Sequence, residues 1–115
     1  MQINSDINYE YSAIILYLNE NFEFDDSALL EKTIITQIDK HSLFNIIINF
    51  KNIKYMNSYS LNEFVQLYSK MLKTGISIFI TELSENVSNL FQTTSLHILI
   101  PIYPSNDAAF KKNNL

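Results

Sequence analysis

Cysteine and arginine are both absent from this chain of 115 residues, and glycine occurs only once. The lack of cysteine excludes disulfides, thiolate metal sites and thiol nucleophiles, and it fits a reducing compartment. The lack of arginine removes the bidentate fork that usually clamps phosphate or carboxylate groups. A phosphate-handling enzyme site would therefore have to rely on lysine or on backbone amides.

Positive charge and long apolar runs are also scarce. Eight lysines face twelve acidic residues, which gives a formal net charge of −4 and no basic field to attract nucleic acid. Apolar stretches such as residues 46–48 are too short to span a bilayer, and residues 1–21 lack the features of a signal peptide. We therefore expect a cytoplasmic protein that binds no nucleic acid and does not insert into a membrane.

The composition is that of one folded domain. Hydrophobic residues make up 47% of the sequence, and no repeat or linker divides it. A chain of this length can bury roughly two-thirds of its unfolded surface in a single core. We therefore predict a single domain over residues 1–115.

The first half of the chain predicts strands on either side of one helix. Residues 7–18 alternate and then run apolar, which is typical of one or two early strands. Residues 44–50 predict a strand buried on both faces, in a sheet covered by helices. Between them, N-cap candidates precede a helix with one apolar face: Asp25, Asp26 and Ser27, then Leu30, Ile34, Ile35 and Ile38. Lys40 and His41 favour the C-terminal end of this helix.

The firmest helix prediction begins near Leu61. Ser60 and Glu63 form a capping-box pattern at its start, and Gly75 follows where a left-handed C-cap is needed. The apolar residues of this helix recur at helical spacing: Leu61, Phe64, Val65, Tyr68, Met71 and Leu72. Residues 76–80 then predict a strand.

The last third of the chain completes an alternation of strands and helices. Ser84 can cap a short helix, residues 96–102 predict a strand that Pro101 places at an edge or ends, and Ser105 begins a final helix. This order predicts an α/β domain with right-handed crossovers. We expect a mixed, partly parallel sheet of four to five strands and about four helices.

A short polar loop, residues 57–60, joins the central strand to the helix near Leu61. A loop in this position displays backbone N–H groups and hydroxyls, and an exposed aromatic side chain such as Tyr59 often anchors an interface. We therefore predict a recognition site with five partner-contact residues: Asn57, Ser58, Tyr59, Ser60 and Asn62.

These elements and motifs resemble the STAS domain (sulphate transporter and anti-sigma factor antagonist) from about Ile7 to Phe110. The family signature is a strand ending in Asp, a short connection, and then Asp-Ser-Ser/Thr-Gly-Leu opening a helix. Here Ile46-Ile47-Ile48-Asn49 resembles the end of the strand, and Asn57-Ser58-Tyr59-Ser60-Leu61 occupies the signature. Shorter matches follow over residues 73–76, 87–96 and 100–110.

The resemblance implies that Tyr59 stands where a partner serine kinase phosphorylates anti-sigma factor antagonists. A phosphoryl group there adds about two negative charges and disfavours docking. Because tyrosine is a poor substrate for a serine kinase, we expect the usual phosphorylation to be lost, with Ser58 and Ser60 as remaining acceptors. Asn49 and Asn57 replace the family's acidic residues, and Ser60 replaces its glycine, through drift in an AT-biased genome or through a change of role.

Other patterns carry little chemistry. His41 and His97 are the only histidines and have no metal-ligand spacing around them, while Ser58 and Ser60 lack the frame of a nucleophile elbow. One acidic group could pair catalytically or bind calcium, but helix capping and solvation explain it more simply: Glu20, Glu23, Asp25 and Asp26. We expect no enzyme activity, no metal and no cofactor.

Three functions remain open. The leading hypothesis is a non-enzymatic interaction module of bacterial signalling and transcription regulation, similar to an anti-sigma factor antagonist. It would bind an anti-sigma factor or serine kinase through residues 57–61 and the following helix. The second is a scaffold or accessory subunit of a signalling complex or transporter, in which phosphorylation is dispensable. The third is a small-ligand sensor that uses the crevice beyond the carboxyl ends of the strands.

Overall fold

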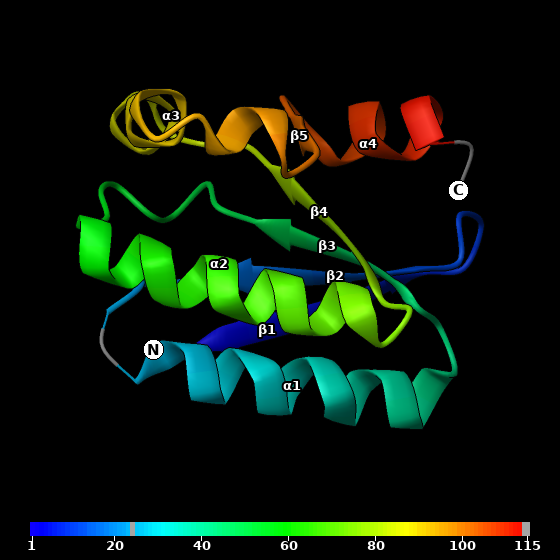
Figure 1. The fold of residues 1–115 in the computed structure, drawn as a ribbon. Helices are drawn as coiled ribbons and strands as arrows, with labels where there is room; N and C mark the ends of the chain where they lie inside the picture. The colour runs from blue at the N-terminus through cyan, green and yellow to red at the C-terminus, as the bar shows by residue number, and fades with distance from the viewer. Residues whose placement is uncertain (24, 114–115) are drawn as a thin grey trace.

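A computed structural model describes residues 1–23 and 25–113 as one α/β domain with a five-stranded mixed sheet (Figure 1). In chain order the elements are β1 (Ile3–Asn8), β2 (Ala13–Leu18), α1 (Asp26–His41), β3 (Asn45–Asn49), α2 (Ser58–Lys73), β4 (Ser77–Thr81), α3 (Glu85–Thr93), the 3-10 helix η1 (Leu96–Ile98), β5 (Ile102–Tyr103) and α4 (Asn106–Asn113). The predicted fold class is therefore confirmed.

The sheet has the order β1-β2-β3-β4-β5. β1 and β2 form an antiparallel hairpin, whereas β2, β3, β4 and β5 are parallel neighbours. Because each of these parallel strands leads into a helix, the N-terminal ends of all four α-helices lie at the carboxyl edge of the sheet. The strand register places Tyr17, Asn49, Thr81 and Tyr103 in one row near this edge.

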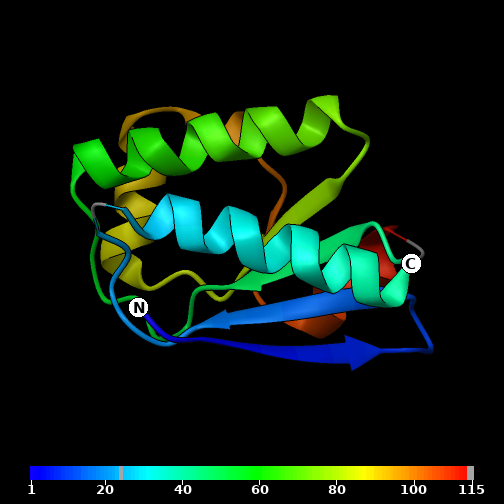
Figure 2. The same ribbon diagram turned by 90° about the horizontal axis from the view of Figure 1, so that it is seen from below.

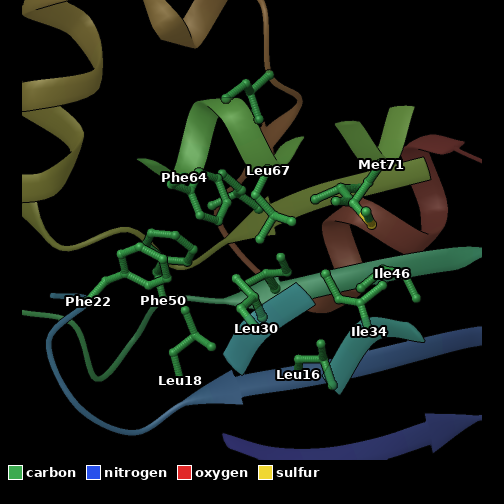
Figure 3. Close-up of a cluster of buried hydrophobic side chains, with 14 of the residues drawn as sticks. Leu16, Leu18, Phe22, Leu30, Ile34, Ile46, Phe50, Phe64, Leu67 and Met71 are labelled. Atoms are coloured by element: carbon green, nitrogen blue, oxygen red, sulfur yellow. The ribbon is translucent and has the colours of Figure 1, made fainter. Parts of the chain in front are cut away.

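The larger core lies between the sheet and the pair α1 and α2 (Figures 1 and 2). Side chains of α1 and α2 point toward those of β2 and β3 in Figure 3, where the labelled contacts include Leu16, Leu18, Leu30, Ile34, Ile46, Phe64, Leu67 and Met71. α3 adds Val87 and Phe91 to the same cluster. Burying this apolar surface stabilises the domain and holds α2 against the strands.

The opposite face of the sheet is covered by α4 (Figure 1). Ala109 and Phe110 of α4 pack on β2, β3 and β4, where they meet Ala13, Ile15, Ile47 and Phe79. The ring of Phe110 also stacks on Tyr11, with 4.6 Å between centroids. Both faces of β3 are therefore buried, as its unbroken run of isoleucines predicts.

The structure has the predicted edge strand, but the predicted bounds, residues 96–102, are wrong. Only Ile102 and Tyr103 pair with β4, and residues 96–98 form η1 instead. The N–H groups of Ile98 and Leu99 donate to the carbonyls three residues earlier, so the backbone closes on itself before it reaches the sheet. Ile98 and Leu99 are consequently exposed.

Two predicted helix faces also need correction. Ile35 in α1 and Leu72 in α2 are 41% and 54% exposed, so neither belongs to the core with its predicted companions. At the start of α1, Asp25 holds the N-cap position with a φ of 70°, but its side chain makes no capping hydrogen bond. The carboxylate of Asp26 instead accepts a hydrogen bond from the N–H of Glu23 at 2.6 Å.

Candidate partner-binding site

Asn57, and not Ser60, caps the start of α2. Asn57 has an extended backbone, and its side-chain oxygen accepts the N–H of Ser60 at 2.7 Å. The helix therefore begins at Ser58, three residues before the predicted start at Leu61. Residues 58–60 form the first turn of the helix, and Ser60 is only 2% exposed. The capping box predicted for Ser60 and Glu63 is therefore wrong.

The other four predicted contact residues lie on the surface around this first turn. Asn57, Ser58 and Asn62 are exposed, and Tyr59 is 55% exposed. Tyr59 lines a hollow of about 370 Å³, which also includes Tyr55 of the preceding loop and residues 21–23 before α1. Ser58 and Asn62 line a separate groove of about 280 Å³ on the side of α3 and η1. The first turn thus presents different side chains to two sides of α2.

The connection from β3 to α2 is held in place by the chain on both sides. The N–H of Lys54 donates to the side-chain oxygen of Asn21 at 2.8 Å, and the hydroxyl of Ser84 donates to the carbonyl of Lys54 at 3.1 Å. The buried side chains of Ile53 and Met56 anchor the same segment in the core. These contacts position the first turn of α2 at the carboxyl edge of the sheet.

Aromatic packing in the core supports the first turn of α2. Phe64, one turn into α2, makes edge contacts with Phe22 and Phe50 at centroid distances of 5.9 and 5.3 Å (Figure 3). Phe50 in turn contacts Phe91 of α3 at 6.3 Å. Such edge-to-face pairs add to the free energy gained from burial alone. The cluster joins α2 to β3, to α3 and to the segment before α1.

A buried polar network lies at the same edge of the sheet, on the α4 side. Asn49, 1% exposed, accepts the N–H of Lys51 at 2.9 Å. Its amide nitrogen donates to the carboxylate of Glu82 and, at 3.1 Å, to the side-chain oxygen of Asn106. An aspartate could not donate to these two oxygens and would place a second carboxylate beside Glu82. The amide at position 49 is therefore the side chain that this environment requires.

The same network secures the start of α4. Asn106 accepts the hydroxyl of Thr81 at 2.6 Å and donates to the hydroxyl of Tyr17 at 3.2 Å. The sequence prediction missed Thr81, Glu82 and Asn106. Its contacts join residues up to 89 positions apart, and no local pattern marks such pairs. The available signal was the row of strand ends that parallel pairing brings together.

The described residues were also compared with the features that a metal site or a membrane-spanning helix requires. Among residues 1–23 and 25–113, no three His, Cys, Asp or Glu side chains gather in a way that could hold a metal ion. His97 lies in η1, and its side chain is outside the described part of the structure. No helix in the described ranges is long and apolar enough to cross a membrane.

The fold and the site define an α/β domain that presents the start of one helix, with its polar and aromatic side chains, at the carboxyl edge of a mostly parallel sheet. The family model of the STAS domain matches residues 2–109, and the chain belongs to that family. The predicted family resemblance is confirmed. Membership supports a general role in protein interaction.

Solved structures share the fold at low sequence identity. An anti-sigma factor antagonist candidate from Thermotoga maritima has a TM-score of 0.80 and 17% identity, covering 96% of this chain and 92% of its own. The anti-sigma factor antagonist SpoIIAA of Bacillus, in its unphosphorylated form, has a TM-score of 0.70 and 14% identity over 99% and 98%. The murine anion transporter Slc26a9 has a TM-score of 0.71 and 16% identity over 85% of this chain and 17% of its own. At these identities the comparisons show the fold alone.

Proposed function

We propose that this protein is a non-enzymatic interaction module that binds an anti-sigma factor or serine kinase through the first turn of α2. The contact residues are Asn57, Ser58, Tyr59 and Asn62, and the following helix extends the surface. Tyr59 carries the proposal, because a large aromatic side chain stands 55% exposed at the rim of a hollow. Aromatic residues in such positions are frequent anchors of protein interfaces.

The same turn supports binding without the usual phosphorylation. Tyr59 replaces the serine or threonine acceptor of the family signature, and Ser60 is too deeply buried for a kinase to reach. Ser58 is the exposed serine of this turn. We expect phosphopeptide mapping of the protein from its native host to find no phosphate on residues 57–61. Phosphate on Ser58 would contradict this part of the proposal.

Capture of the partner from the native host tests the interface directly. The tagged chain, a Tyr59→Asp variant and a Tyr9→Asp variant are compared by mass spectrometry of the proteins that co-purify. Aspartate in the first turn of a helix is favourable, so Tyr59→Asp should leave the fold intact. Tyr9 is a matched control, because it is 77% exposed and lies at the β1–β2 turn, at the opposite end of the strands from the start of α2 (Figure 1).

The expected result is an anti-sigma factor or ATP-binding kinase that is captured by the chain and by Tyr9→Asp but lost from Tyr59→Asp. Loss is expected because the substitution removes the anchor and adds a charge at the interface. A partner recovered equally with all three forms would contradict the proposed interface.

A second candidate is a scaffold or accessory subunit of a signalling complex or transporter. The similarity of the fold to part of an anion transporter, together with the replaced phosphoacceptor, favours it. Recovery of a transporter or scaffold protein in the same capture would support this candidate. The ligand-sensor alternative stays a prediction.

A further inference from the structure

Tyr55 is a second exposed aromatic residue beside the first turn of α2, and it is not among the predicted contact residues. Its side chain is 63% exposed and lines the same hollow of about 370 Å³ as Tyr59. The buried side chains of Phe22 and Met56 also line this hollow. Exposed aromatic rings beside an apolar lining are typical of a surface that receives side chains of a protein partner. Tyr55 is therefore placed to share a contact with Tyr59.

The backbone around Tyr55 is held by other segments of the chain. Residues 53–57 lie between the turn after β3 and the start of α2 and form no helix or strand. Lys54 is fixed at both of its backbone groups: its N–H donates to the side chain of Asn21 at 2.8 Å, and its carbonyl accepts the hydroxyl of Ser84 at 3.1 Å. Because that carbonyl belongs to the planar peptide unit that leads into Tyr55, a movement of the carbonyl turns the backbone of Tyr55.

Ser84 has two roles that can be separated. As the N-cap of α3, its side-chain oxygen accepts the N–H of Val87 at 3.4 Å. The same hydroxyl donates its hydrogen to the carbonyl of Lys54, and Ser84 does not line the hollow itself. The cap requires only an acceptor, whereas the bond to Lys54 requires a donor. Ser84 therefore acts on the hollow as a donor, through Lys54.

We propose that Tyr55 is a further partner-contact residue and that Ser84 is the positioning residue that holds it beside Tyr59. This inference rests on the proposed function, because Tyr55 and Tyr59 line one hollow and meet the same partner. Ser84 holds the Lys54 peptide from the side of α3, and Asn21 holds it from the segment before α1. A contact surface that is already in its bound arrangement loses less conformational entropy on binding, so loss of the link weakens the contact.

Ser84→Asp separates the two roles of Ser84. Aspartate is a good N-cap and suits the N-terminal end of a helix, so α3 and the denaturation midpoint should be unchanged. Its carboxylate cannot donate to the carbonyl of Lys54. In native-state hydrogen exchange the Lys54 amide should therefore exchange at least about fivefold faster, while the amides of β3 keep their rates. Ser84→Thr keeps a hydroxyl and should restore slow exchange at Lys54.

Capture from the native host then tests the contact. Recovery of the protein that the unmodified chain captures should fall at least about threefold with Tyr55→Ala and with Ser84→Asp. Recovery should be unchanged with Ser84→Thr, which keeps the link. It should also be unchanged with Asn86→Asp, the charge control, which adds the same charge at an exposed position of α3.

Unchanged exchange of the Lys54 amide in Ser84→Asp would overturn the positioning role of Ser84. Full recovery of the partner with Tyr55→Ala would overturn the contact, and so would an equal loss with Asn86→Asp and Ser84→Asp. Capture of no anti-sigma factor or kinase by the unmodified chain would contradict the proposed function. The exchange of Lys54 requires no partner, so it decides the role of Ser84 in either case.

Discussion

Asn49 illustrates how a single side chain can depend on its buried surroundings. Its amide accepts one backbone N–H and donates to two oxygens, one of them in the carboxylate of Glu82. Asn49→Asp removes both donated bonds and sets two carboxylates together in a site that is 1% exposed. We expect this change to lower the free energy of unfolding by about 2–4 kcal/mol at pH 7, measured by chemical denaturation.

The destabilisation caused by Asn49→Asp should depend on pH, and its direction follows from the two neighbouring carboxyl groups. In the folded variant the repulsion between positions 49 and 82 favours one protonated carboxyl, so its pKa is higher than in the unfolded chain. The destabilisation therefore grows as the pH rises above about 4 and shrinks in acid. Asn52→Asp is the control, because Asn52 is exposed and the hydrogen bond that its amide donates to Asn19, at 3.0 Å, lies at the surface, so the change should cost no more than about 0.5 kcal/mol. Equal stability of the two variants at pH 7 would show that the network does not require an amide.

At the scale of the element, α2 depends on its N-cap. Asn57→Ala removes the acceptor for the N–H of Ser60 and should destabilise the protein by about 1 kcal/mol. Asn57→Asp keeps an acceptor and adds a charge that the helix N-terminus favours, so the free energy of unfolding should be unchanged or slightly higher. Asn62→Ala, at an exposed position inside the helix, is the control and should change stability by less than about 0.5 kcal/mol. A similar loss in both alanine variants would argue against the cap.

Tyr68 links α2 to the segment after η1, and its phenol should ionise at a higher pH than an ordinary tyrosine. Burial raises the pKa of the Tyr68 phenol above its ordinary value of 10.0. Because the neutral phenol is favoured in the folded state, its contribution to stability is present below about pH 10 and is lost as the pH rises through the folded pKa. The ultraviolet titration difference between the chain and Tyr68→Phe should show an ionisation above pH 10. A difference titration centred at or below pH 10 would contradict the burial.

The same elements show which features a sequence pattern predicts and which features it does not predict. Ser60 with Glu63 and Asn57 with Ser60 are both plausible caps in sequence, and the choice depends on where the backbone leaves the extended conformation. The carboxylate of Glu63 instead accepts a hydrogen bond from the hydroxyl of Ser27, which lies in α1, at 3.4 Å. The apolar run in residues 96–100 predicts a strand equally well, yet only two residues of β5 find pairing positions beside β4. Both errors arise where tertiary position overrides a local preference.

At the scale of the whole molecule, the fold was more predictable than the site. The apolar run of β3 predicts a strand covered on both faces, and helices on both faces of the sheet confirm this. The exposure of Tyr59 was also predictable, because it stands next to a cap-forming polar cluster. The pairing of Asn49 with Asn106 was not, since it joins residues 57 positions apart.

The arrangement of the sheet predicts how the whole domain unfolds. β2, β3 and β4 lie between two helical layers, whereas β1 and the two-residue β5 are the edges. Amide hydrogens of the three inner strands should therefore exchange only through global unfolding, at a free energy of about 5–15 kcal/mol, and those of β5 through easier local opening. Native-state hydrogen exchange measures both.

A core substitution separates these two routes of exchange. Phe64 is 1% exposed and contacts Phe22 and Phe50, so Phe64→Leu should lower global stability by about 1–2 kcal/mol without unfolding the chain. The protection of amides in β2, β3 and β4 should fall by that same amount, because every one of them reports the global event. Amides of β5 should keep their exchange rates, since local opening leaves the Phe64 cluster packed. Unchanged protection in β3 would mean that the sheet and the α2 layer unfold separately, and the domain would then not be one cooperative unit.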